Sequence, residues 1–107
     1  MNDAIPYAYE QEVPIDEATY RKIMAKIGDE PLAGQLVHLT VRTEPGSLRY
    51  IDVWVSKQAY ERAVAERIHP AVAAVFRELG YRPAGEPHKR ELDLVDIRTL
   101  ASASDPR

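Results

Sequence analysis

The sequence predicts a small α+β domain with the element order strand, helix, strand, strand, helix, strand, which is the ferredoxin-like arrangement. Three observations predict it: two apolar stripes at helical spacing, two alternating segments joined by Pro45-Gly46, and one further alternating segment toward each end of the chain. Such an order gives a four-stranded antiparallel sheet with both helices on one face. We expect the bare face to pack on a second copy of the chain in a homodimer.

The first strand and helix are indicated near the N-terminus. Residues 7–13 alternate with period two, and Pro14 closes this strand. Asp16 is a suitable N-cap because its carboxylate can accept from the free amides of the next turn. The apolar stripe of the helix that follows is Tyr20, Ile23, Met24 and Ile27. Gly28 is expected to end this helix.

The central part of the chain predicts a hairpin between strands 35–43 and 48–55. Pro45 and Gly46 occupy the second and third positions of a type II turn, where the third position needs a positive φ. One face of the hairpin is expected to carry Val37, Leu39, Val41, Arg49, Ile51, Val53 and Val55. The other is expected to carry Leu36, His38, Thr40, Arg42, Leu48, Tyr50, Asp52 and Trp54.

A second helix is expected after Ser56, which can cap it. Its apolar positions are Tyr60, Ala63, Val64 and Ile68. Because proline lacks a backbone N–H and clashes with the preceding turn, Pro70 predicts a break near His69, with a short helical continuation to Gly80. A last strand is expected over 88–97.

Length and composition fit one folded unit. The chain has 107 residues, of which 45% are hydrophobic and 29% charged, and this is too apolar for a disordered chain. We expect residues 1–107 to form one domain, with its core over about 5–97 and a flexible tail over 98–107.

Charge and composition disfavour several functional classes. The absence of cysteine excludes disulfides and thiolate chemistry, so a cytoplasmic location is the default expectation. Net charge is −3 and the basic residues are scattered, so no nucleic-acid partner is expected. No segment approaches the roughly 20 apolar residues of a membrane span, and no signal-like segment opens the chain. Neither a membrane partner nor export is expected.

One group of side chains on the polar hairpin face suggests a site. Cross-strand neighbours lie within about 5 Å, so His38 and Thr40 should lie near Tyr50, Asp52 and Trp54. His38 would be a general base and Asp52 would orient it, which makes this pair the candidate catalytic residues. Tyr50, Trp54 and Thr40 would contact a small, partly aromatic substrate.

A structural reading of the same residues stands beside the catalytic one. A buried polar network on a sheet face can serve only to set the register of a dimer. Trp54 is more often a core residue than a ligand platform. The chain could thus be a non-catalytic ligand-binding or protein-interaction module. Tyr7 and Tyr9 are further candidates for lining the same cavity, because sequence does not fix the register of adjacent strands.

The remaining polar residues give weaker signals. His69 is expected at the surface, and His88 with Lys89 and Arg90 is expected to be a solvated strand end. The three histidines have no metal-ligand spacing, so no metal site is assigned. The sequence also lacks a phosphate-binding glycine loop and a nucleophile elbow.

The stretch Ile51–Tyr60, read as IDVWVSKQAY, resembles the strand-to-helix junction of the antibiotic biosynthesis monooxygenase-like proteins. That resemblance implies a dimeric α/β barrel with cavities between sheet and helices. In enzymatic members it implies oxygenation of aromatic substrates without a cofactor, so no cofactor is expected. The haem-degrading members carry a tryptophan and a histidine where this chain has Ala63 and Ala73, which disfavours haem degradation.

Overall fold

The computed structural model describes residues 5–82 and 87–98 and follows the predicted order of elements. The elements are β1 (Tyr7–Val13), α1 (Glu17–Ile27), β2 (Gln35–Glu44), β3 (Ser47–Trp54), α2 (Lys57–Ala63), a π-helical turn (Val64–Ile68), α3 (His69–Leu79) and β4 (Lys89–Leu92). The predicted α+β class is therefore confirmed. Most of the tail expected over 98–107 lies outside the described residues.

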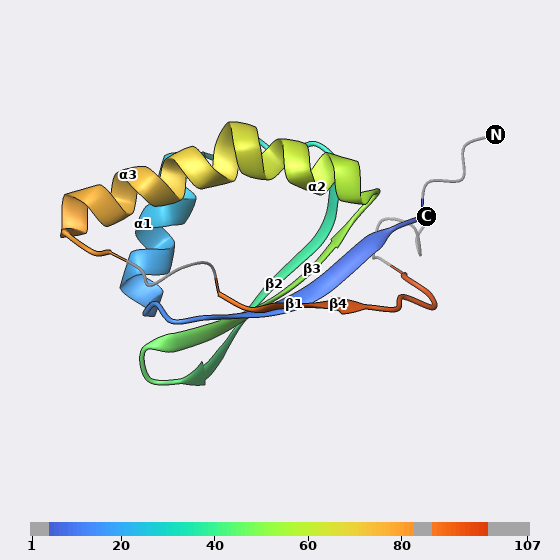
Figure 1. The fold of residues 1–107 in the computed structure, drawn as a ribbon, viewed down its shortest axis with the longest axis horizontal. Helices are drawn as coiled ribbons and strands as arrows, with labels where there is room; N and C mark the ends of the chain where they lie inside the picture. Colours follow the sequence, from blue (N-terminus) through green and yellow to red (C-terminus); the bar gives the residue numbers. More distant parts are fainter. Residues whose placement is uncertain (1–4, 83–86, 99–107) are drawn as a thin grey trace, which may run out of the picture.

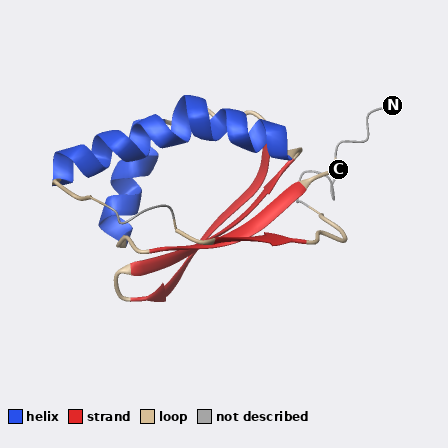
Figure 2. Cartoon of the chain, viewed as in Figure 1, coloured by secondary structure: helices blue, strands red, loops and turns tan. Residues whose placement is uncertain are grey.

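The strands form one antiparallel sheet in the order β2-β3-β1-β4. All helices lie on the same side of this sheet, as Figures 1 and 2 show. This arrangement confirms the ferredoxin-like topology. None of the described helices combines the length and the apolarity needed to cross a bilayer.

The predicted caps and the hairpin turn are confirmed. Asp16 accepts a hydrogen bond from the backbone N–H of Thr19 at 2.8 Å. Ser56 accepts one from the N–H of Ala59 at 3.1 Å. Gly46 has a φ of 81°, a conformation that a type II turn requires and that glycine adopts without steric cost. These local signals place the start of both helices and the turn of the hairpin.

The predicted break at Pro70 is wrong, because a π-helical turn takes its place. Pro70 has no N–H to donate to the carbonyl four residues earlier. Just before it the helix widens, and the N–H of His69 bonds the carbonyl of Val64, five residues back. α2, the π-helical turn and α3 therefore form one continuous rod over the sheet (Figure 1).

The last strand is shorter than predicted. β4 pairs with β1 only over Lys89–Leu92, and residues 93–98 are not in a strand. Leu92 already lies opposite Ala8. The ladder would continue toward Pro6, which has no N–H to contribute. β4 thus ends close to where β1 begins.

The helical layer rests on the sheet at two core clusters. The first lies under α1 and α3 and contains Val13, Ile15, Tyr20, Ile23, Leu48 and Val75. The second lies toward α2 and contains Tyr7, Tyr9, Trp54 and Ala63. Partly buried side chains such as Met24, Phe76, Leu32 and Ile68 flank these clusters. Between these two core clusters, space for a cavity remains between the sheet and the helices.

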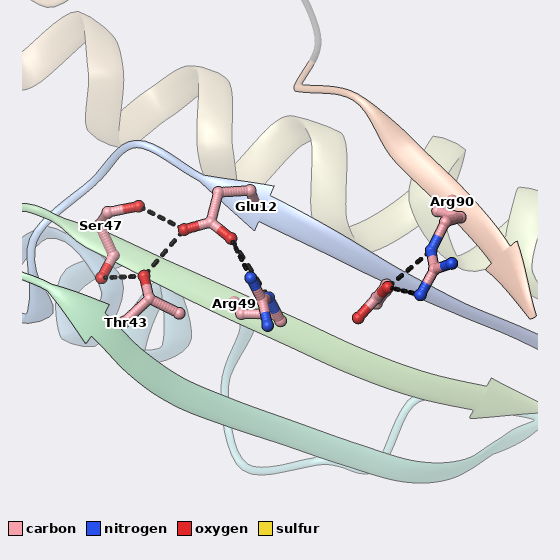
Figure 3. Close-up of polar contacts among 6 residues, drawn as sticks. Glu12, Thr43, Ser47, Arg49 and Arg90 are labelled. Atoms are coloured by element: carbon pink, nitrogen blue, oxygen red, sulfur yellow. Dashed lines mark hydrogen bonds and ion pairs between the residues drawn. The ribbon is translucent and has the colours of Figure 1, made fainter.

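The opposite sheet face is partly bare. Leu39 and Val41 on β2 are 50% and 44% exposed, and they alternate with the helix-facing residues of that strand. At the hairpin end this face is polar. Figure 3 shows Glu12 accepting hydrogen bonds from the hydroxyls of Thr43 and Ser47, each at 2.8 Å, beside the guanidinium of Arg49. These bonds tie β1 to both strands of the hairpin.

Candidate functional site

A cavity of about 810 Å³ lies between the sheet and the helices. Its volume falls within the range of small-molecule sites. The sheet contributes Tyr9, Gln11, Gln35, His38, Tyr50, Asp52 and Trp54, which we call the floor. The helices contribute Ile23, Met24, Ile27, Val64, Ile68, Val72 and Phe76, which we call the roof. The polar groups of the strands thus face a mainly apolar roof, to which α3 also contributes His69.

His38 and Asp52 form a hydrogen-bonded pair in the floor. They lie directly opposite each other on β2 and β3, and His38 Nδ1 is 2.5 Å from Asp52 Oδ1. Asp52 is only 2% exposed, whereas the His38 side chain is 25% exposed. Gln35 donates a second bond to the same carboxylate oxygen at 3.3 Å. Tyr9, directly opposite Asp52 on β1, is a further hydrogen-bond partner of this carboxylate.

The other nitrogen of His38 belongs to a chain of hydroxyl groups. His38 Nε2 is 2.9 Å from the Tyr20 hydroxyl and 3.0 Å from Thr40 Oγ1, and Thr40 donates to Tyr20 at 2.9 Å. A neutral His38 that donates Nδ1–H to Asp52 would accept from Tyr20 at Nε2. A protonated His38 would instead donate to one of these oxygens. The chain therefore accommodates both protonation states.

His38 also borders a second, smaller hollow on the outside of the site. This hollow has a volume of about 360 Å³ and is lined by Glu17, Tyr20, Arg21, His38, Thr40, Arg42 and Leu48. Asp52 is not among its described lining residues, and Thr40 does not line the large cavity. His38 thus connects the large cavity with the smaller hollow.

Two floor tyrosines stay protonated well above neutral pH. Burial raises the pKa of Tyr9 above its ordinary value, and the negative charge of Asp52 adds to this effect. Burial likewise raises the pKa of Tyr50, with smaller contributions from Tyr20 and Asp52. The Tyr50 ring packs edge-on against His38, with centroids 5.4 Å apart. Both phenols are therefore suited to donate hydrogen bonds and not to act as bases.

A cluster of aromatic rings surrounds Lys89 at the α2 end of the cavity. The Tyr7, Tyr9 and Tyr60 ring centroids lie 5.2, 5.1 and 4.1 Å from Lys89 Nζ. The ammonium also donates a hydrogen bond of 3.0 Å to the Tyr60 hydroxyl. We call these three tyrosines and Lys89 the aromatic cage. Tyr9 and Tyr60 belong both to this cage and to the cavity wall.

Most of the predicted site residues meet at the cavity. His38, Asp52, Tyr50 and Trp54 all line it. Trp54 has no exposed surface and packs edge-on against Tyr60 at 5.6 Å, and its Nε1–H has no partner among the described residues. Trp54 is therefore a packed, structural part of the cavity wall. Of the two further tyrosine candidates, Tyr9 lines the cavity.

Sequence reasoning missed Gln35, Tyr20 and Tyr60. Gln35 was given no face in the predicted strand, and strict alternation would place it with Val37. A register shift between these two residues instead brings its amide to Asp52. Leu36, expected beside His38, is left exposed. Tyr20 and Tyr60 were recognised only as parts of apolar helical stripes. Their hydroxyl groups were the available signal, because a tyrosine at a buried position usually needs a polar partner.

The described residues contain no group of three or more histidine, aspartate or glutamate side chains arranged to hold a metal ion. The polar floor is instead suited to hydrogen bonding and proton transfer with an organic molecule. Among the described lining residues there is no lysine or arginine.

No family model matches the sequence, and no curated protein does. Solved structures do match the fold. An antibiotic biosynthesis monooxygenase-like protein from Caulobacter crescentus is 19% identical, with a TM-score of 0.61 over 85% of this chain and 91% of that one. One from Chloroflexus aurantiacus is 14% identical, with a TM-score of 0.64 over 90% and 99%. SnoaB, a cofactor-independent oxygenase from Streptomyces nogalater, is 20% identical, with a TM-score of 0.52 over 91% and 98%.

Proposed function

We propose that this chain, whose fold is that of the antibiotic biosynthesis monooxygenase-like proteins, is a cofactor-independent oxygenase acting on a small, partly aromatic molecule. The observation that carries the proposal is the His38–Asp52 pair in the floor of a cavity of about 810 Å³. A carboxylate and an imidazole so placed can take a proton from a molecule bound in the cavity.

The roles of the two residues follow from their surroundings. Asp52 lines the cavity, and His38 pairs with its Oδ1 while keeping its own link to Tyr20 and Thr40. The substrate proton would pass to the Asp52–His38 pair, and His38 would hold it as an imidazolium paired with the carboxylate. Tyr50 would contact the ring of the substrate, and Trp54 would support the wall.

The chemical step needs only the substrate and dioxygen. Removal of a proton from an activated CH₂ group leaves a carbanion, which gives its electrons to O₂ and forms a carbon–oxygen bond. The peroxide takes a proton back from the His38–Asp52 pair and then loses water to leave a carbonyl group. The balance is CH₂ + O₂ → C=O + H₂O, so the substrate is oxidised and one oxygen atom is retained.

The bare sheet face supports a homodimer as part of this proposal. Leu39 and Val41 are exposed large apolar residues of β2, and they alternate with the helix-facing residues of that strand. An apolar sheet face of this kind is stabilised by covering it, and a two-fold axis would place the same patch on both sides of the contact.

A screen of redox-active aromatic molecules tests the proposal. Ligands are first found by quenching of the fluorescence of Trp54, the single tryptophan of the chain. Binders are then mixed with protein in air without added cofactor, and O₂ uptake and ¹⁸O incorporation are measured. We expect uptake that falls at least 100-fold, on the scale of general base catalysis, in His38→Ala and Asp52→Asn.

The competing function is a ligand-binding module without turnover. One observation favours it, namely that both ring nitrogens of His38 already have partners within the protein. Ligands that bind tightly yet consume no O₂ would support this second function and contradict the first. Binding that is unchanged in His38→Ala would in addition remove His38 from the site.

A further inference from the structure

The ammonium of Lys89 is held by tyrosines and not by a carboxylate. It is partly buried in the aromatic cage and makes no ion pair with any residue of 5–82 or 87–98. The neighbouring charges are already matched, because Lys57 pairs with Glu91 at 3.6 Å and Glu91 accepts a hydrogen bond from Tyr7. Burial alone would lower the pKa of Lys89, but hydrogen bonding to Tyr60 and Tyr7 outweighs it and raises the pKa. The site thus carries a fixed positive charge.

Tyr60 connects this charge to the cavity. Its hydroxyl oxygen accepts from Lys89, and its ring is held by Tyr7, Tyr9 and Trp54 at centroid distances of 5.2, 5.1 and 5.6 Å. The hydroxyl proton has no acceptor in the described part of the chain, although Tyr60 lines the cavity. A hydroxyl whose oxygen accepts from an ammonium is a stronger donor.

We propose that Tyr60, held and polarised by Lys89, binds an anionic oxygen of the ligand at the end of the cavity away from His38. The ligand would be a hydroxy-aromatic or enolic molecule bound as its oxyanion. This inference rests on the proposed function, since it supplies the group that stabilises the negative charge left when the base removes a proton.

The spacing of the two ends fits such a molecule. Asp52 and Trp54 are alternate residues on one face of β3, about 7 Å apart. Trp54 contacts Tyr60, and Asp52 contacts His38. A single ring or a fused pair of rings can therefore reach both the acceptor at Asp52 and the donor at Tyr60. Asp52 would oppose an anion, but its charge is balanced once His38 holds the transferred proton.

The test uses 4-nitrophenol, whose phenol and phenolate forms differ in visible absorbance. The whole chain is titrated with the probe bound, and the pH at which the bound probe ionises is compared with that of the free probe. We expect the pKa of the bound probe to lie roughly one unit below that of the free probe, as for an acid beside a fixed positive charge. Lys89→Met and Tyr60→Phe should abolish most of the shift, and Lys89→Arg should retain it.

Lys57→Met is the matched control. Lys57 also lies over the ring of Tyr7, at 5.7 Å, but it is paired with Glu91 and is more exposed. Its variant should leave the shift unchanged. Fluorescence of Trp54 and thermal melting establish that each variant is folded and binds the probe, and a merely structural role of Lys89 would change melting without moving the ionisation of bound probe.

Each outcome decides the inference separately from the oxygenase proposal. A downward shift that disappears in Lys89→Met and Tyr60→Phe supports it, even if no ligand consumes O₂. An unshifted probe, a shift that both variants retain, or no binding of 4-nitrophenol at millimolar concentration overturns it, even if O₂ uptake depends on His38.

Discussion

His38 Nδ1 lies 2.5 Å from Asp52 Oδ1, and the two residues occupy directly opposed positions on β2 and β3. A buried carboxylate that loses its hydrogen-bond donor retains the full cost of its desolvation. Because Asp52 is almost fully buried, this contact contributes to folding as well as to the site. The free energy of unfolding reports its contribution to folding, and ligand binding reports its contribution to the site.

Replacing His38 with alanine should lower the free energy of unfolding by about 1–3 kcal/mol, the cost of an unsatisfied buried polar group. Urea denaturation at pH 7 measures the change. His88→Ala is the control, because His88 is exposed and should leave stability within about 0.5 kcal/mol. Equal stability of the two variants would show that water replaces the His38 contact.

The raised pKa values of Tyr9 and Tyr50 predict a loss of stability at alkaline pH. A group whose pKa is higher in the folded than in the unfolded state stabilises the fold fully below its unfolded value, and this stabilisation is lost as pH rises through the folded pKa. Loss should begin near the ordinary value of 10.0 and reach about 1 kcal/mol for each tyrosine near pH 11. Urea denaturation between pH 8 and 11 checks it.

The phenylalanine variants provide the comparison for this pH dependence. Tyr9→Phe and Tyr50→Phe should each flatten the alkaline limb, whereas Tyr81→Phe should not, because Tyr81 is 40% exposed. If the free energy of unfolding falls equally steeply with pH in all three variants, groups other than Tyr9 and Tyr50 cause the alkaline loss of stability.

Replacing Leu39 with glutamate should convert a homodimer to a monomer. The charge would lie in the middle of the bare sheet face, where it would be buried without a partner in the contact. Light scattering coupled to gel filtration measures the mass. Leu79→Glu is the control, since Leu79 is similarly exposed, at 47%, but lies on α3. A wild-type monomer at micromolar concentration would contradict the proposed assembly.

Arg67 should stabilise the loop that follows α1. Its guanidinium donates to the backbone carbonyls of Ile27, Glu30 and Pro31 at 2.8, 3.1 and 3.1 Å. Arg67→Ala should lower stability by about 1.5–3 kcal/mol, the range for a hydrogen bond from a charged group. It should also speed amide hydrogen exchange near Glu30. Arg62→Ala, which removes an exposed arginine from α2, should do neither.

Gly34 should tolerate alanine less well than Gly28 does. Both have positive φ, 89° and 91°. A Cβ on Gly34 would lie 2.7 Å from the Cβ of Ala59, while one on Gly28 would meet nothing within 4 Å. Thermal melting should give a loss of about 1–2 kcal/mol for Gly28→Ala, from backbone strain alone. Gly34→Ala should cost about 1–3 kcal/mol more, because β2 and α2 must separate.

Local signals predicted much of the fold and half of the site. The Pro45-Gly46 turn joins β2 to β3 as a hairpin, and a register shift between Arg42 and Glu44 then brings His38 opposite Asp52. Caps at Asp16 and Ser56 likewise depend on neighbours three residues away. Interactions of this kind can be read from a single segment.

The remaining features depend on contacts between distant segments. Tyr20 reaches His38 from α1, and Lys89 reaches Tyr60 from the last strand, 29 residues later in the chain. Neither contact follows from periodicity, because it depends on how helices and edge strands sit over the sheet. The register shift at the start of β2 was equally hidden, since no proline or glycine between Gln35 and Val37 marks it.

The π-helical turn has a consequence for how the roof of the cavity tolerates insertions and deletions. Val64–Ile68 holds one more residue than a regular turn would need, and Val72 and Phe76 follow it into the roof. Because the wider turn accommodates this extra residue, the residues beyond it keep the facing they would have in an uninterrupted α-helix. Removing Ala65, an exposed residue of this turn, would convert the turn to regular α-helix and leave Val72 and Phe76 directed at the floor of the cavity. Removing a residue from α2 instead, which holds no extra residue, would rotate everything beyond it by about 100° and turn the roof side chains away from the ligand. The π-helical turn is therefore the part of this rod where the loss of one codon would leave the site intact.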